Sequence, residues 1–193
     1  MMKRAMDLGL TILTMPVWLP VLLAGMAAVF CTMRRPVFYV SKRAGKDGKV
    51  FDFWKLRTMR EGEGSDGERL TKTGRLLRKL SIDELPQLFL VLAGKMSLVG
   101  PRPLPERYLP RYSKEQFRRH EVLPGITGWA QVNGRNELEW EEKFALDVWY
   151  VDHRNLALDW KILYLTIKNC ANFTGVNHPK YDTMVEFKGE NHP

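Results

Sequence analysis

A long uncharged segment near the N-terminus constrains this chain more than any other feature. No Asp, Glu, Lys or Arg occurs from Leu8 to Met33, and about 20 predominantly apolar residues suffice to cross the hydrocarbon core of a bilayer. The segment also lacks the small-residue cleavage site of a secretory leader. We therefore expect it to be embedded in a membrane and to remain part of the protein.

Two features bear on whether this segment crosses the membrane. Pro16 and Pro20 lie in its middle, and a proline inside a helix removes a backbone hydrogen bond and bends the helix. Basic residues flank both ends, as Lys3-Arg4 before the segment and Arg34-Arg35 after it, and basic flanks favour the cytoplasmic side. These residues alone leave two geometries open: a single spanning helix, and a re-entrant helix-break-helix that enters one leaflet and returns.

The rest of the chain is long enough for one compact domain. We expect residues 1–35 to form the membrane element and residues 36–193 to form a cytosolic domain at the membrane surface. The chain has 30 Lys and Arg against 22 Asp and Glu. This basic balance favours an anionic partner such as a nucleic acid, a phospholipid or a nucleotide, without choosing among them. Its two cysteines, Cys31 and Cys170, have neither metal-ligand spacing nor the density of a disulfide scaffold.

Periodicity and turn residues predict a mostly helical α+β fold with short strands and amphipathic helices at the membrane interface. Residues 36–40 and 50–54 are expected to pair as a hairpin, and a further short strand is expected at 129–132. The acidic, glycine-rich stretch 61–69 is expected to be a mobile loop. Further helices are predicted from Ser81 to Ala93, Ser113 to Arg119, Trp140 to Val151 and Leu158 to Phe173.

Two adjacent carboxylates, Asp83 and Glu84, are the first candidates for chemistry. Ser81 with Glu84 three residues later is the pattern of a capping box, in which each side chain satisfies a backbone N–H at a helix start. That pattern explains Glu84 but not Asp83. In a first helical turn, the helix dipole would keep Asp83 ionised and its pKa low. Such a carboxylate is a poor general base but a serviceable nucleophile or metal ligand.

Basic residues surround these carboxylates in the sequence. Arg102 lies between Pro101 and Pro103, which stiffen the backbone on either side of it. A structural cluster of ion pairs and a binding site for phosphate groups both remain open at this stage. The other basic residues considered are Lys55, Arg57, Arg75, Arg78, Lys79, Lys95 and Arg135, the last in a glycine-rich turn.

The sequence favours a phosphorylated substrate handled at a membrane surface. It contains no P-loop, no GxGxxG after a strand and no HExxH. Asp83 could attack a phosphorus atom and split a transfer into two steps through an acyl-phosphate intermediate. Mg²⁺ would suit this chemistry, because it prefers one or two carboxylates together with substrate phosphate oxygens. Two other functions stay open: a membrane-anchored module that binds anionic lipid or nucleic acid without catalysis, and a metal-dependent phosphohydrolase.

Several motifs in order resemble one family, the monotopic phosphoglycosyl transferases, also called bacterial sugar transferases. The motifs are Lys3-Arg4 with Asp7, Lys55 to Met59, Ser81 to Leu88, Ser97 to Pro103 and Pro124 to Asn136. The resemblance implies transfer of a phospho-sugar from a UDP-sugar to a polyprenol phosphate such as undecaprenyl phosphate, with release of UMP. It also implies dependence on Mg²⁺ and a re-entrant helix at the cytoplasmic face of the bacterial inner membrane, among its lipids and with both termini cytosolic.

The resemblance also assigns roles to individual residues. It implies that Asp83 is the nucleophile and contacts Mg²⁺, with Glu84 as its partner, and that Pro16 and Pro20 bend the membrane helix. The basic residues that it matches are Arg102 and Arg78 for phosphate, Lys55 and Arg57 in a basic motif of the active-site face, and Arg135 for the nucleotide. It implies no nucleic-acid partner and leaves a homo-oligomer open.

One departure from the family pattern concerns the membrane segment. Family members often carry serine just before the helix-breaking proline, whereas this chain has Met15-Pro16. A side-chain hydrogen bond to the freed backbone is therefore not available from that position. The chain also lacks the long multi-span N-terminal region of larger members, so we expect a minimal catalytic form.

Overall fold

The computed structural model describes residues 2–134, 138–171 and 186–189. The chain divides into two compact units, the first made of Met1–Ser41 with Phe53–Ala93 and the second of Lys42–Asp52 with Gly94–Pro193. Within the described residues both units are mainly helical, with two small two-stranded sheets. The predicted α+β, mostly helical class is therefore confirmed.

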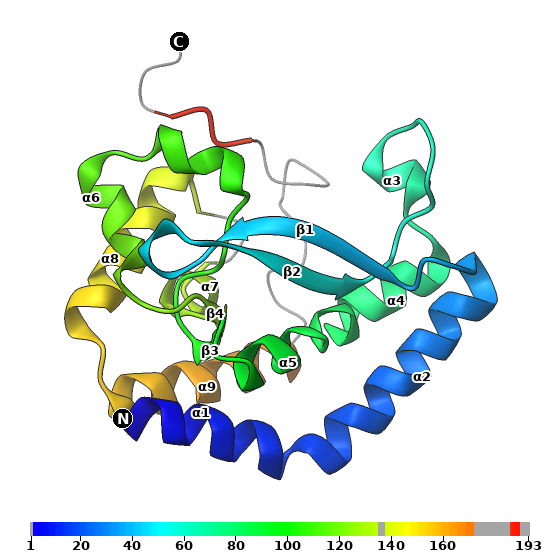
Figure 1. Ribbon diagram of the computed structural model, residues 1–193, viewed down its shortest axis with the longest axis horizontal. Helices are drawn as coiled ribbons and strands as arrows, with labels where there is room; N and C mark the ends of the chain where they lie inside the picture. The colour runs from blue at the N-terminus through cyan, green and yellow to red at the C-terminus, as the bar shows by residue number, and fades with distance from the viewer. Residues whose placement is uncertain (1, 135–137, 172–185, 190–193) are drawn as a thin grey trace. The chain divides into compact units, whose positions relative to one another are not determined.

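The helices and strands of the two units are labelled in Figure 1. The first unit contains α1 (Met2–Leu13), α2 (Met15–Met33), α3 (Asp66–Arg69), α4 (Lys72–Lys79) and α5 (Gln87–Leu92). The second contains α6 (Lys114–Phe117), α7 (Trp129–Val132), α8 (Trp140–His153), α9 (Leu156–Ala171), β3 (Ser97–Val99) and β4 (Gly125–Thr127). Strands β1 (Phe38–Ala44) and β2 (Val50–Leu56) pair as a hairpin.

The N-terminal segment is a helix-break-helix, as predicted. Helix α1 ends at Leu13 and α2 begins at Met15, and the two helices run in different directions in Figure 1. Pro16 lies in the first turn of α2, where a backbone N–H would have no carbonyl acceptor within the helix, so its absence costs no helical hydrogen bond. Pro20 lies inside α2, which is continuous through it. The interruption therefore lies at Thr14, immediately before the first turn that holds Pro16.

Side chains satisfy the backbone at this break. The Thr14 hydroxyl donates to the carbonyl of Leu10 at 2.7 Å, and the Trp18 indole N–H donates to the carbonyl of Thr11 at 3.0 Å. Buried or lipid-facing carbonyls without a partner are costly, so a helix break needs such donors. Thr14 and Trp18 therefore place side-chain donors at the break, although the Leu10 carbonyl also accepts from the Thr14 backbone N–H.

The core of the first unit forms around one stripe of α2. Trp18, Leu22 and Val29 are buried on it, together with Gly25, and they recur at helical spacing. The absence of a side chain on Gly25 permits close approach, since a Cβ there would lie 2.9 Å from both Leu56 and Ile82 side chains. Figure 1 shows α2, α4 and α5 within this unit. Partners on the other elements are Leu56, Leu77, Ile82, Leu85 and Leu88.

The hairpin prediction is confirmed, and the loop prediction after it needs correction. Strands β1 and β2 extend to Ala44 and Leu56, with a 3₁₀ turn at Lys46–Gly48 between them. Within 61–69, expected to be a loop, Asp66–Arg69 forms one helical turn. The reason is local, because Ser65 and Glu68 form a capping box that satisfies the backbone at its start.

The second unit is built on a short parallel pair, with Ser97 opposite Gly125 and Val99 opposite Thr127. Helices α8 and α9 pack near it through Tyr150 and Ile162. The predicted helices at 113–119, 140–151 and 158–173 are confirmed within the described residues. The strand predicted at 129–132 is wrong, because those residues form α7, and the strand is Gly125–Thr127 instead. The sequence did not indicate this strand because glycine has a low strand preference. Glycine is needed at positions 125 and 128, since a Cβ at either would clash with the backbone of Gly100.

A close backbone contact in the first unit gives a testable prediction. A Cβ on Gly74 would lie 1.9 Å from the carbonyl oxygen of Thr58, which cannot move aside as a flexible side chain can. We expect Gly74→Ala to destabilise the protein by about 3 kcal/mol, at the upper end of overpacking effects. Thermal unfolding in detergent, followed by circular dichroism, measures this.

Gly9→Ala is the matched control, because nothing lies within 4 Å of its added Cβ. Alanine is the better helix former by about 1 kcal/mol, so the unfolding midpoint should stay constant or rise. Equal midpoints for the two variants would show that the contact at Gly74 is not tight.

Candidate functional site

The segment that carries the two carboxylates is not the start of a helix. Ser81 is in the left-handed conformation (φ 55°) and makes no capping hydrogen bond with its side chain. Ile82–Glu84 forms a single 3₁₀ turn, and α5 begins only at Gln87. The predicted capping box is therefore wrong. The capping box does not form because Ser81, in the left-handed conformation, terminates helix α4. The backbone of Ser81 therefore does not have the extended conformation of a residue that caps the start of a helix.

Asp83 and Glu84 face a lysine from β2. Asp83 is 5% exposed. The Lys55 ammonium lies 3.8 Å from Asp83 Oδ2 and 2.6 Å from Glu84 Oε1. The structure thus brings together Lys55, Asp83 and Glu84, which the sequence analysis had named as separate candidates. The Glu84 carboxylate accepts a hydrogen bond from Lys55 and does not cap a helix. Charge-assisted bonds of this kind fix side-chain orientation.

The neighbouring residue Ile82 connects this turn to helix α2. Its side chain packs in the core around α2, close to Gly25. Leu85, on the other side of the carboxylates, packs against the same core. Asp83 is therefore held by apolar contacts on both sides in the chain, which restricts where its carboxylate can lie.

Two of the predicted phosphate-binding arginines have protein partners in the first unit. Arg57 donates to the carbonyls of Met33 and Arg34 at the end of α2, and to Glu61 Oε1 at 3.2 Å. Arg78 donates from Nε to the Thr58 hydroxyl at 3.0 Å. These bonds satisfy terminal carbonyls of α2 and fix α4 against residue 58. The phosphate role of both arginines stays a prediction.

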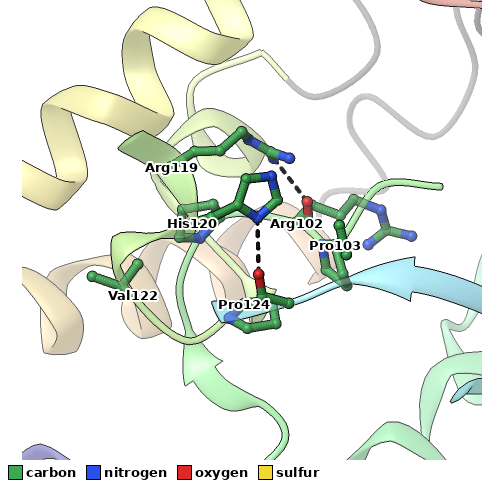
Figure 2. Close-up of a pocket in the computed structure, with 9 residues that line it drawn as sticks. Arg102, Pro103, Arg119, His120, Val122 and Pro124 are labelled. Carbon is green, nitrogen blue, oxygen red and sulfur yellow. Dashed lines mark hydrogen bonds between the residues drawn. The ribbon is translucent and has the colours of Figure 1, made fainter. Parts of the chain in front are cut away.

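The remaining predicted site residues lie elsewhere in the chain. Arg102 belongs to the second unit, where it is partly buried between two buried prolines. Figure 2 shows its guanidinium extending away from Arg119 and His120. Arg135 lies outside the described residues.

Sequence reasoning missed the buried groups beside Arg102. Arg119 and His120, at the end of the predicted helix 113–119, are buried. Arg119 pairs with Asp147 of α8. Charge patterning gave no signal of this. The aromatic residues near them, Tyr112 and Phe144, were the available hint that a packed core lies there.

His120 is a neutral ring in this environment. Burial, together with the nearby Arg119 guanidinium, lowers the pKa of His120 to about 4, while the bond to Gly45 opposes the shift. A carbonyl can only accept, so His120 Nδ1 donates to the Gly45 oxygen at 2.9 Å (Figure 2). Nε2 is then an unprotonated acceptor at neutral pH, buried and without a partner among the described residues.

Comparison with known proteins gives a consistent result. Residues 1–172 match a family model described as bacterial sugar transferase. The chain is 50% identical over 194 residues to the uncharacterized sugar transferase EpsL of Bacillus subtilis (strain 168), covering 97% of this chain and 96% of that protein.

Two further relatives have more specific names and are longer. The chain is 41% identical to an undecaprenyl-phosphate glucose phosphotransferase of Komagataeibacter xylinus, over 86% of this chain and 35% of that protein. It is 38% identical to a UDP-glucose:undecaprenyl-phosphate glucose-1-phosphate transferase of Escherichia coli (strain K12), over 86% of this chain and 39% of that protein. The chain thus spans little more than a third of the length of these two relatives.

The lysine between the two carboxylates gives the next prediction. Lys55→Met would remove the cation that Asp83 and Glu84 face and leave two adjacent carboxylates to repel each other. We expect a loss of about 1–3 kcal/mol in unfolding free energy, below the cost of breaking a fully buried pair because Lys55 is partly exposed. Lys55→Arg should retain most of the stability. Thermal or denaturant unfolding measures all three proteins.

The control is Lys42→Met. Lys42 pairs with Asp52 at 2.8 Å, but both side chains are about half exposed, and exposed pairs contribute little. If the Lys42 and Lys55 variants lose equal unfolding free energy, the ion pairs around Asp83 contribute no more to stability than an exposed pair does.

Proposed function

Because the chain belongs to the bacterial sugar transferase family, we propose that it is a phosphoglycosyl transferase. It would move a sugar-1-phosphate from a UDP-sugar to a polyprenol phosphate such as undecaprenyl phosphate and release UMP. Support for this donor and acceptor comes from the names of the relatives from Komagataeibacter and Escherichia coli. The reaction would begin the assembly of a bacterial glycan on its lipid carrier.

One observation carries the proposal: a buried carboxylate, Asp83, faces Lys55 in a turn packed on the apolar helix α2. A phosphoryl transfer to a lipid needs a nucleophile and cations held near a membrane segment.

The proposed reaction has two steps on one phosphorus atom. In the first, a carboxylate oxygen of Asp83 attacks the phosphorus that bears the sugar. The new O–P bond forms while the bond from that phosphorus to the bridging oxygen breaks, and UMP leaves with the electron pair. In the second, a phosphate oxygen of the polyprenol phosphate attacks the same phosphorus and expels the Asp83 carboxylate. The product is a polyprenyl diphosphate sugar, and the enzyme is regenerated.

The cations have distinct roles in this proposal. Lys55, held by Glu84, lies beside the Asp83 carboxylate and can neutralise negative charge as the phosphate approaches. Arg102 would bind a phosphate group bidentately, a geometry that suits a guanidinium. Arg78 and Arg57 would add to the positive field, and Arg135 would contact the nucleotide.

A magnesium ion fits the donor set of the site. Among the described residues no group of three or more His, Cys, Asp or Glu side chains could hold a metal. Mg²⁺ does not need one, because it is often bound by one or two carboxylates plus substrate phosphates. Asp83, with Glu84 beside it, would hold the ion together with the diphosphate. When bound, the ion would supply neutralisation of the phosphate oxygens.

The membrane segment supports a location at the lipid surface. By length and composition, one helix in the described chain, Met15–Met33, could cross a membrane. Apolar residues of α2 outside its buried stripe, including Val17, Leu23 and Phe30, are exposed. A helix that is apolar all round is typical of lipid contact. We propose that the break at Thr14 makes this segment re-entrant, on the cytoplasmic face of the bacterial inner membrane with both termini cytosolic.

Covalent labelling tests the proposed nucleophile. Incubation with a UDP-sugar and no lipid acceptor should leave the mass of a phospho-sugar on Asp83, detected by mass spectrometry of the intact protein and its peptides. Addition of polyprenol phosphate should remove the label. Asp83→Asn should give neither label nor turnover, because an amide cannot act as the nucleophile.

Asp52→Asn serves as the control, since this carboxylate also pairs with a lysine but is exposed, and it should retain both label and activity. An active Asp83→Asn variant, or wild-type turnover without any labelled intermediate, would reject the covalent route. Steady release of sugar phosphate to water without lipid would instead identify a phosphohydrolase.

Topology can be tested by cysteine accessibility. In a variant without the native cysteines, single cysteines at Met2 and at Arg35 should both react with a membrane-impermeant reagent only from the cytoplasmic side. A re-entrant helix keeps both ends on one side. Labelling from opposite sides would mean that the segment spans the bilayer.

A further inference from the structure

We propose that the buried ion pair of Arg119 and Asp147 is a positioning device for Arg102. The pair holds the backbone of the segment Pro101–Pro103, here called the arm, so that the Arg102 guanidinium is presented in one orientation. This inference rests on the proposed function, which assigns Arg102 to the substrate phosphates. It adds two positioning residues from η4, the 3₁₀ turn Arg118–Glu121, and from α8.

The arm is held at its carbonyl groups. Neither Pro101 nor Pro103 has an N–H, so the arm has few donors with which to join a sheet or helix. Two of its carbonyl oxygens accept hydrogen bonds from other segments instead. Pro101 accepts from the Gly125 N–H at 3.0 Å, and Arg102 accepts from Arg119 Nη2 at 2.8 Å. Just beyond the arm, Leu104 accepts from the Ala44 N–H at 3.0 Å. Only the bond to Arg102 among these three comes from a side chain.

The donor on Arg119 is itself fixed. Arg119 and Asp147 are each 3% exposed. Asp147 Oδ2 accepts from Arg119 Nε at 3.1 Å and from Nη2 at 2.6 Å, and Nη1 reaches the Tyr112 hydroxyl at 3.3 Å. The guanidinium also lies over the rings of Tyr112 and Phe144. Three kinds of contact therefore orient one planar group, and its Nη2 also donates to the Arg102 carbonyl (Figure 2).

Stability alone is a weak reason for such a pair. Burying two charges costs desolvation that their attraction offsets only partly, and apolar residues of similar volume often stabilise a protein equally well. An apolar pair could not donate to the Arg102 carbonyl, however. A phosphate-binding group is effective when its geometry is set before the substrate arrives, and a misplacement of about 1 Å can cost about 100-fold in rate.

The decisive variant replaces the pair by apolar residues, as Arg119→Met with Asp147→Leu. If the pair only stabilises the fold, a variant that folds should remain active. If it positions Arg102, the variant should keep its unfolding midpoint while sugar-phosphate transfer falls about 10- to 100-fold. Hydrogen exchange of the peptide that covers residues 98–108 should become faster, because the arm has lost a hydrogen bond.

The chain offers a matched control next to this pair. Arg118 and Asp152 come from the same two elements and also pair, but both are at least partly exposed. The other partners of Arg118 are Glu115 and Glu121, not the arm. Arg118→Met with Asp152→Leu should change neither transfer nor exchange at residues 98–108.

A double-mutant cycle separates action through Arg102 from a direct effect. Arg102→Ala should lower transfer, and adding the Arg119 and Asp147 substitutions should then cause little further loss. Additive losses would overturn the inference, and so would a folded pair variant with unchanged transfer and exchange. If the pair variant does not fold, Arg119→Lys, which keeps the charge but not the planar fork, is carried through the same cycle.

The outcome also distinguishes this inference from the proposed function. If the unmodified protein transfers nothing, or if Arg102→Ala is fully active, the function or the role of Arg102 is rejected. Hydrogen exchange then still decides whether Arg119 and Asp147 hold the arm, because that measurement needs no substrate.

Discussion

The packing of α2 against the turn Ile82–Glu84 is the interaction on which the first unit depends. Gly25 leaves room for Ile82 and Leu56, so the turn lies directly on the apolar helix. The carboxylate of Asp83 follows Ile82 immediately and faces Lys55 from β2. A helix that would be lipid-embedded thus forms part of the core that orients a charged group. This arrangement suits chemistry in which one substrate is a lipid and the other is water-soluble.

The two units hold their polar groups by different means. In the first, the buried carboxylate of Asp83 meets the partly exposed side chains of Lys55 and Glu84. In the second, Arg119 and Asp147 are withdrawn from water, and their hydrogen bonds are made to each other, to Tyr112 and to the arm. Both groups rely on charge-assisted hydrogen bonds, but Lys55 and Glu84 of the first keep part of their side chains exposed, whereas Arg119 and Asp147 of the second do not.

Much of the fold could be predicted from local patterns. The break near Pro16, the hairpin and the long helices α8 and α9 follow from proline position, turn residues and apolar periodicity. Three predictions failed for local reasons as well, one of them the loop at 61–69, where Ser65 and Glu68 cap a helical turn. The capping box at Ser81 had the right residue types, but its left-handed backbone places them outside a helix. The strand at 129–132 was displaced to Gly125–Thr127, where glycines needed for close packing carry no strand preference.

The sequence by itself determined that the chain carries an apolar segment interrupted by prolines, that Asp83 and Glu84 are adjacent, and that basic motifs occur in a family-like order. Covalent order and residue chemistry are sufficient for these conclusions. Tertiary structure decided which groups meet: Lys55 with Asp83 across 28 positions, and Arg119 with both Asp147 and the Arg102 carbonyl. Long-range pairing and burial depend on how separate elements pack, and no local pattern of charge around Arg119 distinguishes this buried arginine from its partly exposed neighbour Arg118.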